Sequence, residues 1–131
     1  MIVCVTNRAL CRRDFLKQLA LIGEGRPDTV ILRERDLDDA AYENLARKCM
    51  SVLAPFGVSL TIHGRPKIAR SIGAACFHLP FPMLKEEKNL PISCSVHTLE
   101  EAKTAEKRGA ALLIAGHIFE TDCKKGVPPR G

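Results

Sequence analysis

Short apolar runs rich in β-branched residues alternate with segments of helical periodicity along the whole chain. A strand followed by a helix or loop, repeated in series, predicts a parallel sheet with right-handed crossovers. Two architectures fit this alternation: an open, doubly wound α/β sheet and a (β/α)₈ barrel. The predicted strands are residues 2–6, 29–33, 58–63, 75–79, 92–96 and 111–116, and the predicted helices are residues 14–22, 38–53 and 98–108, one beginning at Pro66 and a weak one near 84–89.

Helix boundaries can be read from capping residues in three places. Asp38 or Asp39 can accept hydrogen bonds from the free N–H groups at the start of the second helix. Thr98 and Glu101 have the spacing of a capping box, and Gly109 suits the end of that helix. These signals place the last helix directly between the fifth and sixth predicted strands.

Composition narrows the class of protein. The 131 residues suit one domain, and 46% of them are hydrophobic, which is enough for an aliphatic core. The net charge of +5 is compatible with an anionic small molecule, but the basic residues form no stripe or known motif, so we expect no nucleic-acid partner. No apolar stretch approaches the roughly 18–20 residues that span a bilayer, so we expect a cytoplasmic protein without a membrane partner.

The six cysteines do not form a recognisable site. No C-x-x-C pair is present, which argues against structural zinc and against a redox dithiol. Cys4, Cys49, Cys76 and Cys94 lie within apolar runs, where a free thiol packs as a small hydrophobic group. Reduced cysteines agree with a cytoplasmic protein.

All four histidines fall at or just past the carboxyl end of a predicted strand: His63, His78, His97 and His117. In both candidate architectures the active site lies at this end of the sheet. Histidine titrates near neutrality, so the set suggests proton transfer. A metal site is the weaker interpretation, because no strand-end carboxylate accompanies the histidines.

Several cationic and hydroxyl side chains accompany the histidines. Arg33 and Arg35 leave the second strand on one face and suit a phosphate or carboxylate, although Arg35 could instead pair with Glu34, Asp36 or acids of the next helix. Ser95 and His97 share a face in the same way. Thr121, Lys124 and Lys125 follow the sixth strand and could neutralise an anion, or they could simply be solvated.

Five stretches carry a family resemblance: ILRER (31–35), IHGRPKIA (62–69), FHLP (77–80), SVHTLEEAKTAEKRGA (95–110) and GHIFETDCKKGVPPRG (116–131). They resemble the thiamine phosphate synthase/TenI superfamily. The resemblance implies a (β/α)₈ TIM barrel of the thiamine phosphate synthase type, here ending after its sixth strand. It also implies that residues 1–131 form a single, incomplete barrel domain.

Within this superfamily the chain looks more like a thiazole tautomerase than a synthase. Synthases resembling it carry proline after the glycine of the last motif, where this chain has His117, and a second threonine where it has Cys123. They also place Asn-Asp after the third strand, where this chain has His63 and Gly64, and a further Asp near Met83. Without those carboxylates a magnesium pyrophosphate site lacks its oxygen ligands. We therefore expect no metal and no cofactor.

The resemblance implies an isomerase of thiamin biosynthesis that converts a carboxythiazole phosphate tautomer to the aromatic thiazole. It assigns the acid–base role to His117. Two alternatives remain: a synthase-like transferase, and an inactive family member that binds or regulates. The expected ligand is a thiazole phosphate, and the residues expected to bind it are Arg33, Arg35, His63, Ser95, His97, Thr121 and Lys124.

The position of the last motif raises a question of assembly. The resemblance implies that a helix and two more strands follow the GHIFETDCKKG stretch, and that the loops of those strands carry a phosphate site at the N-terminus of a short helix. A truncated gene product, a fragment of a longer chain, and a protein that closes itself by dimerisation all fit the sequence. We expect a homo-oligomer, because open strand edges present unpaired N–H and C=O groups.

Overall fold

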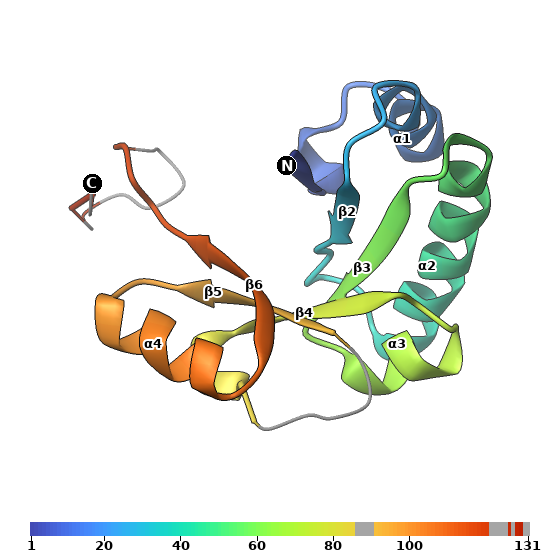
Figure 1. The fold of residues 1–131 in the computed structure, drawn as a ribbon. Helices are drawn as coiled ribbons and strands as arrows, with labels where there is room; N and C mark the ends of the chain where they lie inside the picture. The colour runs from blue at the N-terminus through green and yellow to red at the C-terminus, as the bar shows by residue number, and fades with distance from the viewer. Residues whose placement is uncertain (86–90, 121–125, 127, 130–131) are drawn as a thin grey trace. The chain divides into compact units, whose positions relative to one another are not determined.

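The computed structural model describes residues 1–85, 91–120, 126 and 128–129. Strands and helices alternate through these residues (Figure 1). The strands that the described residues form are β1 (Val3–Val5), β2 (Thr29–Leu32), β3 (Ser59–His63), β4 (Cys76–Pro80), β5 (Ile92–Val96) and β6 (Ala110–Ala115). Their α-helices are α1 (Phe15–Glu24), α2 (Asp39–Leu53), α3 (Pro66–Ser71) and α4 (Leu99–Lys107).

The chain divides into two compact units, Met1–Phe77 and His78–Gly131. The first unit contains β1 to β3 with α1 to α3, the second contains β5, β6 and α4, and β4 contributes residues to both. Short 3₁₀ turns at Arg8–Leu10, Ala54–Phe56 and Phe81–Met83 complete the connections.

The sheet of the first unit is parallel. Thr29 pairs with Val3 on one side and with Ser59 on the other, so β2 lies between β1 and β3. Val30, Ile31 and Leu32 are at most 1% exposed. A central strand buried on both faces is typical of a parallel sheet covered by helices. The predicted parallel arrangement is confirmed in this unit.

Helix α2 supplies the largest part of the core of the first unit. Asp38 caps it by accepting the Ala41 N–H at 2.8 Å, as predicted. Four of its residues at successive intervals of four, three and four positions are fully buried: Tyr42, Ala46, Cys49 and Leu53. This face packs against β3, and α1 packs beside α2 (Figure 1).

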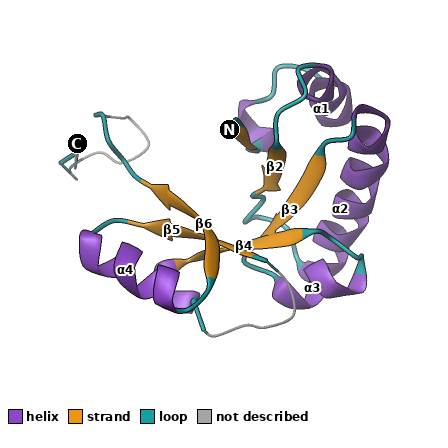
Figure 2. Cartoon of the chain, in the orientation of Figure 1, coloured by secondary structure: helices purple, strands orange, loops and turns teal. Residues whose placement is uncertain are grey.

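The second unit repeats the pattern with β5 and β6 in parallel and α4 packed along both (Figure 2). Thr98 Oγ1 accepts the Glu101 N–H at 3.1 Å, which confirms the predicted cap. The Glu101 carboxylate accepts the N–H of His97 at 2.6 Å, one residue before the position that a capping box would use. The carboxylate therefore holds the residue that leaves β5 as well as the start of the helix.

Several predicted boundaries differ from the structure, most of them by one residue. Strand β1 begins at Val3, and α1 continues through Gly23 to Glu24. Gly23 packs directly against the ring of Phe56, which leaves no room for a Cβ. The weak helix predicted near 84–89 does not begin at Leu84. The N–H of Leu84 instead closes a 3₁₀ turn that contains Pro82. Residues 86–90 lie outside the described residues.

None of the helices in the described ranges has the length and apolar content that a bilayer span requires.

The described cysteines are free thiols. Cys49 and Cys94 are fully buried, as predicted, whereas Cys4 and Cys76 are only half-buried. Burial of Cys49 raises the pKa of its thiol from the ordinary 9.0 to about 12, and burial likewise raises the pKa of Tyr42 from 10.0 to about 12. Both groups are thus held neutral in the folded chain.

The Cys49 shift predicts a loss of stability at alkaline pH. Between pH 9 and 12 the unfolded chain releases the thiol proton and the folded chain retains it, so the free energy of unfolding falls as pH rises. The fall approaches about 1.4 kcal/mol per pH unit for one such group. Urea unfolding of wild type and Cys49→Ala at pH 8.0 to 10.5 should give a shallower pH slope for the variant. Parallel slopes would contradict the assignment.

Candidate functional site

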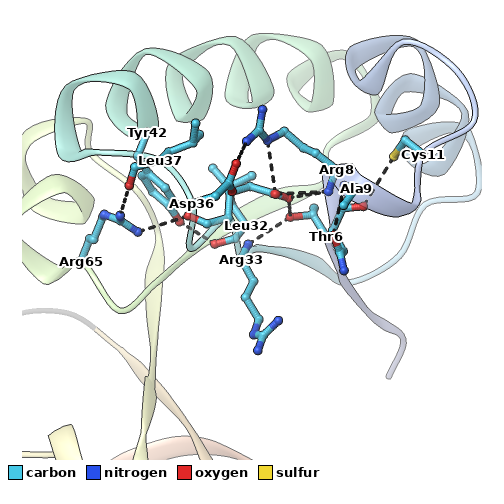
Figure 3. A network of polar contacts seen from close by, with 12 residues as sticks. Thr6, Arg8, Ala9, Cys11, Leu32, Arg33, Asp36, Leu37, Tyr42 and Arg65 are labelled. Atoms are coloured by element: carbon cyan, nitrogen blue, oxygen red, sulfur yellow. Dashed lines mark hydrogen bonds and ion pairs between the residues drawn. The ribbon is translucent and has the colours of Figure 1, made fainter. Parts of the chain in front are cut away.

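Arg33 and Arg35 follow the carboxyl end of β2. The Arg33 N–H donates to Thr6 Oγ1 at 3.0 Å, which joins the ends of β2 and β1. The Arg33 side chain extends away from the surrounding network (Figure 3), and its guanidinium has no hydrogen-bond or ion-pair partner in the described part of the chain. Arg35 is exposed. The Arg33 guanidinium is therefore available to bind an anion.

Between the two arginines lies a buried carboxylate. Glu34 is 3% exposed, and its oxygens accept hydrogen bonds from Thr6 Oγ1 at 2.6 Å, from the Arg8 N–H at 3.2 Å and from Arg8 Nε at 3.3 Å. The Nη2 atom of the Arg8 guanidinium forms an ion pair with Asp36 (Figure 3). The alternative role for Arg35, an ion pair with Glu34, Asp36 or an acid of the next helix, is wrong: in the described part of the chain Arg35 forms no ion pair, and Arg8 pairs with both Glu34 and Asp36.

Replacing this carboxylate should destabilise the first unit. In Glu34→Ala the Thr6 hydroxyl, the Arg8 amide and the Arg8 guanidinium lose their shared acceptor, and we expect a loss of about 2–4 kcal/mol in the free energy of unfolding. Asp36→Ala is the matched control, since it removes an exposed partner of the same arginine and exposed pairs contribute under about 1 kcal/mol. Urea unfolding compares them. Equal losses in the two variants would contradict the role given to Glu34.

His63 is the last residue of β3, as predicted, and is half-buried. Its N–H donates to the hydroxyl of Tyr42 at 3.2 Å, and that hydroxyl donates to the carbonyl of Leu32. Tyr42 therefore ties the ends of β2 and β3 together. Arg65 lies 4.2 Å above the Tyr42 ring and also holds Asp39 and the carbonyl of Leu37 (Figure 3).

In the second unit His78 and Ser95 come together. His78 is the third residue of β4 and only 3% exposed, so the prediction that it lies at a strand end is wrong. Its Nε2 lies 2.7 Å from Ser95 Oγ and its Nδ1 lies 2.8 Å from Ser93 Oγ. The predicted strand ends at Leu79, whereas β4 continues to Pro80, so His78 lies two residues before the strand end.

His97 and His117 lie just past the ends of β5 and β6, as predicted. The Nδ1 atom of exposed His97 is hydrogen-bonded to the carbonyl of Gly116, the residue directly before half-buried His117. His97 thus fixes the backbone from which the His117 side chain leaves the strand. Thr121 and Lys124, which were expected to bind the anion, lie outside the described residues.

Cavities lie near these elements, each within one unit. One of about 410 Å³ is lined by Asp39 and by Gly64 and Arg65, which directly follow His63. A cavity of about 280 Å³ borders His97, Gly116 and Ile118, and His117 is not among its lining residues. A larger one of about 550 Å³ opens between β1 and α1, where it is lined by Thr6, Leu10 and Phe15. None of the predicted site residues borders the larger cavity, so its size alone does not locate the chemistry.

The sequence did not predict four residues that hold the strand ends of the first unit: Arg8, Glu34, Tyr42 and Arg65. Glu34 stands between two arginines in the sequence, which suggests local pairing, yet its partner comes from 26 positions earlier. For Tyr42, the usable signal was its place as the chain's one tyrosine on the apolar face of a predicted helix. Arg65 gave no signal beyond its place before Pro66.

Comparison with known proteins decides the family. Residues 2–131 match the family described as thiamine monophosphate synthase, TMP-TENI. The chain belongs to the thiamine phosphate synthase/TenI superfamily. A relative from Aquifex aeolicus is 32% identical over 133 residues, covering 97% of this chain and 72% of the relative. The thiamine-phosphate synthase of Syntrophomonas wolfei is also 32% identical, covering 95% of this chain and 64% of the relative.

The solved structure of a thiamine phosphate pyrophosphorylase from Pyrococcus furiosus has the same fold. It superimposes with a TM-score of 0.82 at 24% identity, over 92% of this chain and 61% of that protein. The predicted fold class, that of a (β/α)₈ barrel of the thiamine phosphate synthase type, is thereby confirmed for the β/α units that the chain contains. The chain spans between 61% and 72% of the length of these three proteins.

Proposed function

We propose that this chain carries the acid–base site of a thiazole tautomerase of thiamine biosynthesis. The observation that carries the proposal is the position of His117 just past β6, directly after Gly116, whose carbonyl is hydrogen-bonded to His97. Membership of the superfamily supports the pathway. The proposed substrate is a carboxythiazole phosphate tautomer, and the product is its aromatic isomer.

The proposed reaction moves one proton between two carbons of the substrate. One carbon loses a proton to the imidazole of His117, and the electron pair shifts through the ring system as aromaticity forms. A second carbon then takes a proton from the imidazolium, which returns His117 to its starting state. An imidazole suits both halves, because it can accept a proton as a base and then return it as an acid.

The substrate also carries two anionic groups that need partners. Arg33 is our candidate for the carboxylate or the phosphate, because guanidinium binds either with paired hydrogen bonds and this one has no partner within the described residues. Arg35, His63, Ser95 and His97 remain further candidates for contact with substrate, and Thr121 and Lys124 remain candidates outside the described residues.

Removing the imidazole tests the acid–base role. His117→Ala should lower kcat for the tautomer at least about 100-fold with little change in KM, because general acid–base catalysis contributes roughly 10² to 10⁴. Glu120→Gln, an exposed change three residues along the same segment, is the control and should keep wild-type rates. Rates follow from the ultraviolet absorbance of the aromatic product. Wild-type kcat in His117→Ala would rule out the assignment.

A separate substitution tests anion binding by Arg33. Arg33→Met keeps the apolar stem and removes the charge, and we expect KM to rise about 10-fold or more while kcat falls less. Arg12→Met, an exposed change elsewhere in the same unit, should leave both parameters unchanged. An unchanged KM in Arg33→Met would show that this side chain does not touch substrate.

A second candidate function, thiamine phosphate synthase, is favoured by the names of the relatives and of the structural neighbour. That reaction joins a pyrimidine pyrophosphate to a thiazole phosphate with Mg²⁺. The residues present do not fit such a metal site. β3 ends at His63 and continues into Gly64 without a carboxylate, and no three His, Cys, Asp or Glu side chains converge within the described ranges. Magnesium-dependent formation of thiamine phosphate by this chain would favour the synthase.

A further inference from the structure

A histidine and two serines form a hydrogen-bonded chain inside the second unit. His78 lies in β4 and is 3% exposed, with Ser93 Oγ 2.8 Å from its Nδ1 and Ser95 Oγ 2.7 Å from its Nε2. Both distances are those of well-formed hydrogen bonds. Each ring nitrogen thus has a hydroxyl partner from the neighbouring strand β5.

The two serines differ in their access to a ligand. They alternate with Cys94 along β5, so both project from one face of the strand while Cys94 projects from the other. Ser93 is 1% exposed, whereas Ser95 is half-buried. In the hydrogen-bonded series Ser93–His78–Ser95, Ser95 is therefore the end that a bound molecule can reach, and Ser93 is the buried end.

The direction of these hydrogen bonds determines whether the Ser95 hydroxyl can donate a hydrogen bond to a ligand. A neutral imidazole has one N–H and one lone pair, so one serine donates to the ring and the other accepts from it. If Nε2 carries the proton, it donates to Ser95 Oγ, Ser93 donates to Nδ1, and the Ser95 hydroxyl proton is free to bind an acceptor. In the opposite tautomer the Ser95 proton is used by His78, and Ser95 presents only lone pairs.

We propose that His78 is a positioning residue, which with Ser93 orients the Ser95 hydroxyl as a hydrogen-bond donor to an anionic oxygen of the substrate. The ligand is the same thiazole phosphate, so this inference rests on the proposed function. An anionic oxygen on Ser95 favours the tautomer with the proton on Nε2, because the other tautomer sets lone pairs against negative charge.

Two substitutions of His78 separate the two ring nitrogens. The amide nitrogen of His78→Gln can occupy the place of Nε2 and donate to Ser95, whereas the amide of His78→Asn reaches only the place of Nδ1. Binding of the aromatic thiazole phosphate, with and without its carboxylate, is measured by titration calorimetry. We expect His78→Gln to bind within about threefold of wild type, and His78→Asn and Ser95→Ala to bind about 10-fold more weakly.

Cys94→Ala is the matched control, since it changes the buried residue between the two serines on the opposite face of β5. It should leave affinity unchanged even where it lowers stability. If His78→Asn loses the same affinity for both ligands, the group that accepts the hydrogen bond from Ser95 is the phosphate. If it loses affinity only for the carboxylated ligand, that group is the carboxylate. Wild-type affinity in His78→Asn, or a loss in His78→Gln equal to that in His78→Asn, would overturn the proposal.

A measurement on the unchanged protein does not depend on how the variants fold. Nitrogen-15 NMR of the histidine rings distinguishes protonated from unprotonated nitrogen, and we expect the His78 signals of the thiazole phosphate complex to show a protonated Nε2 and an unprotonated Nδ1. A proton on Nδ1 in the complex, alone or together with one on Nε2, would overturn the proposal. If the ring shows the expected state but the protein does not convert the tautomer, the proposed function fails and the role of His78 in binding stands.

Discussion

The buried carboxylate of Glu34 is the interaction on which the strand ends of the first unit depend. It accepts hydrogen bonds from a hydroxyl, a backbone amide and a guanidinium that all belong to the segment after β1. Thr6, held in this way, accepts the backbone N–H of Arg33. The Arg33 side chain is half-buried and extends away from this network (Figure 3). The buried acid thus holds the backbone from which the Arg33 side chain leaves.

Tyr42 extends the same arrangement to the next strand. Its hydroxyl donates to the carbonyl of Leu32 and accepts the N–H of His63, so one buried side chain from α2 satisfies the backbone at the ends of β2 and β3. Arg65 covers the ring and holds the turn before α2 through Leu37. Polar groups at strand ends are thus held by a few side chains from distant segments, and within the described residues no buried side-chain nitrogen or oxygen lacks a partner.

The second unit uses histidines for a similar purpose. His78 holds two hydroxyls of β5, and His97 holds the carbonyl of Gly116, so each of them orders the backbone or side chain of a neighbouring strand. His117 follows that carbonyl, and its proposed role needs a fixed backbone because proton transfer requires hydrogen-bond reach to both reacting carbons. Two histidines therefore organise structure beside one that is proposed to do chemistry. The fourth, His63, ends β3 in the first unit and donates its backbone N–H to Tyr42.

How much the sequence could predict depended on the range of the interaction. Short-range signals succeeded: β5 has its predicted bounds, Asp38 and Thr98 cap their helices, and Pro66 begins α3. Long-range partners could not be read from spacing, since Arg8 reaches Glu34 across 26 positions and His78 reaches Ser93 across 15. The sequence predicts that the fourth strand ends at Leu79, whereas β4 includes Pro80 as its last residue and His78 lies two positions before that end.

The central claim is that this chain moves a proton rather than joining two substrates. The most direct test is to incubate it with the carboxythiazole phosphate tautomer in D₂O containing EDTA and to follow the reaction by proton NMR. The account predicts conversion to the aromatic thiazole with deuterium at the carbon that gains a proton, at the same rate with and without the chelator. No conversion under either condition, with thiamine phosphate formed from pyrimidine pyrophosphate and thiazole phosphate once Mg²⁺ is supplied, would contradict it.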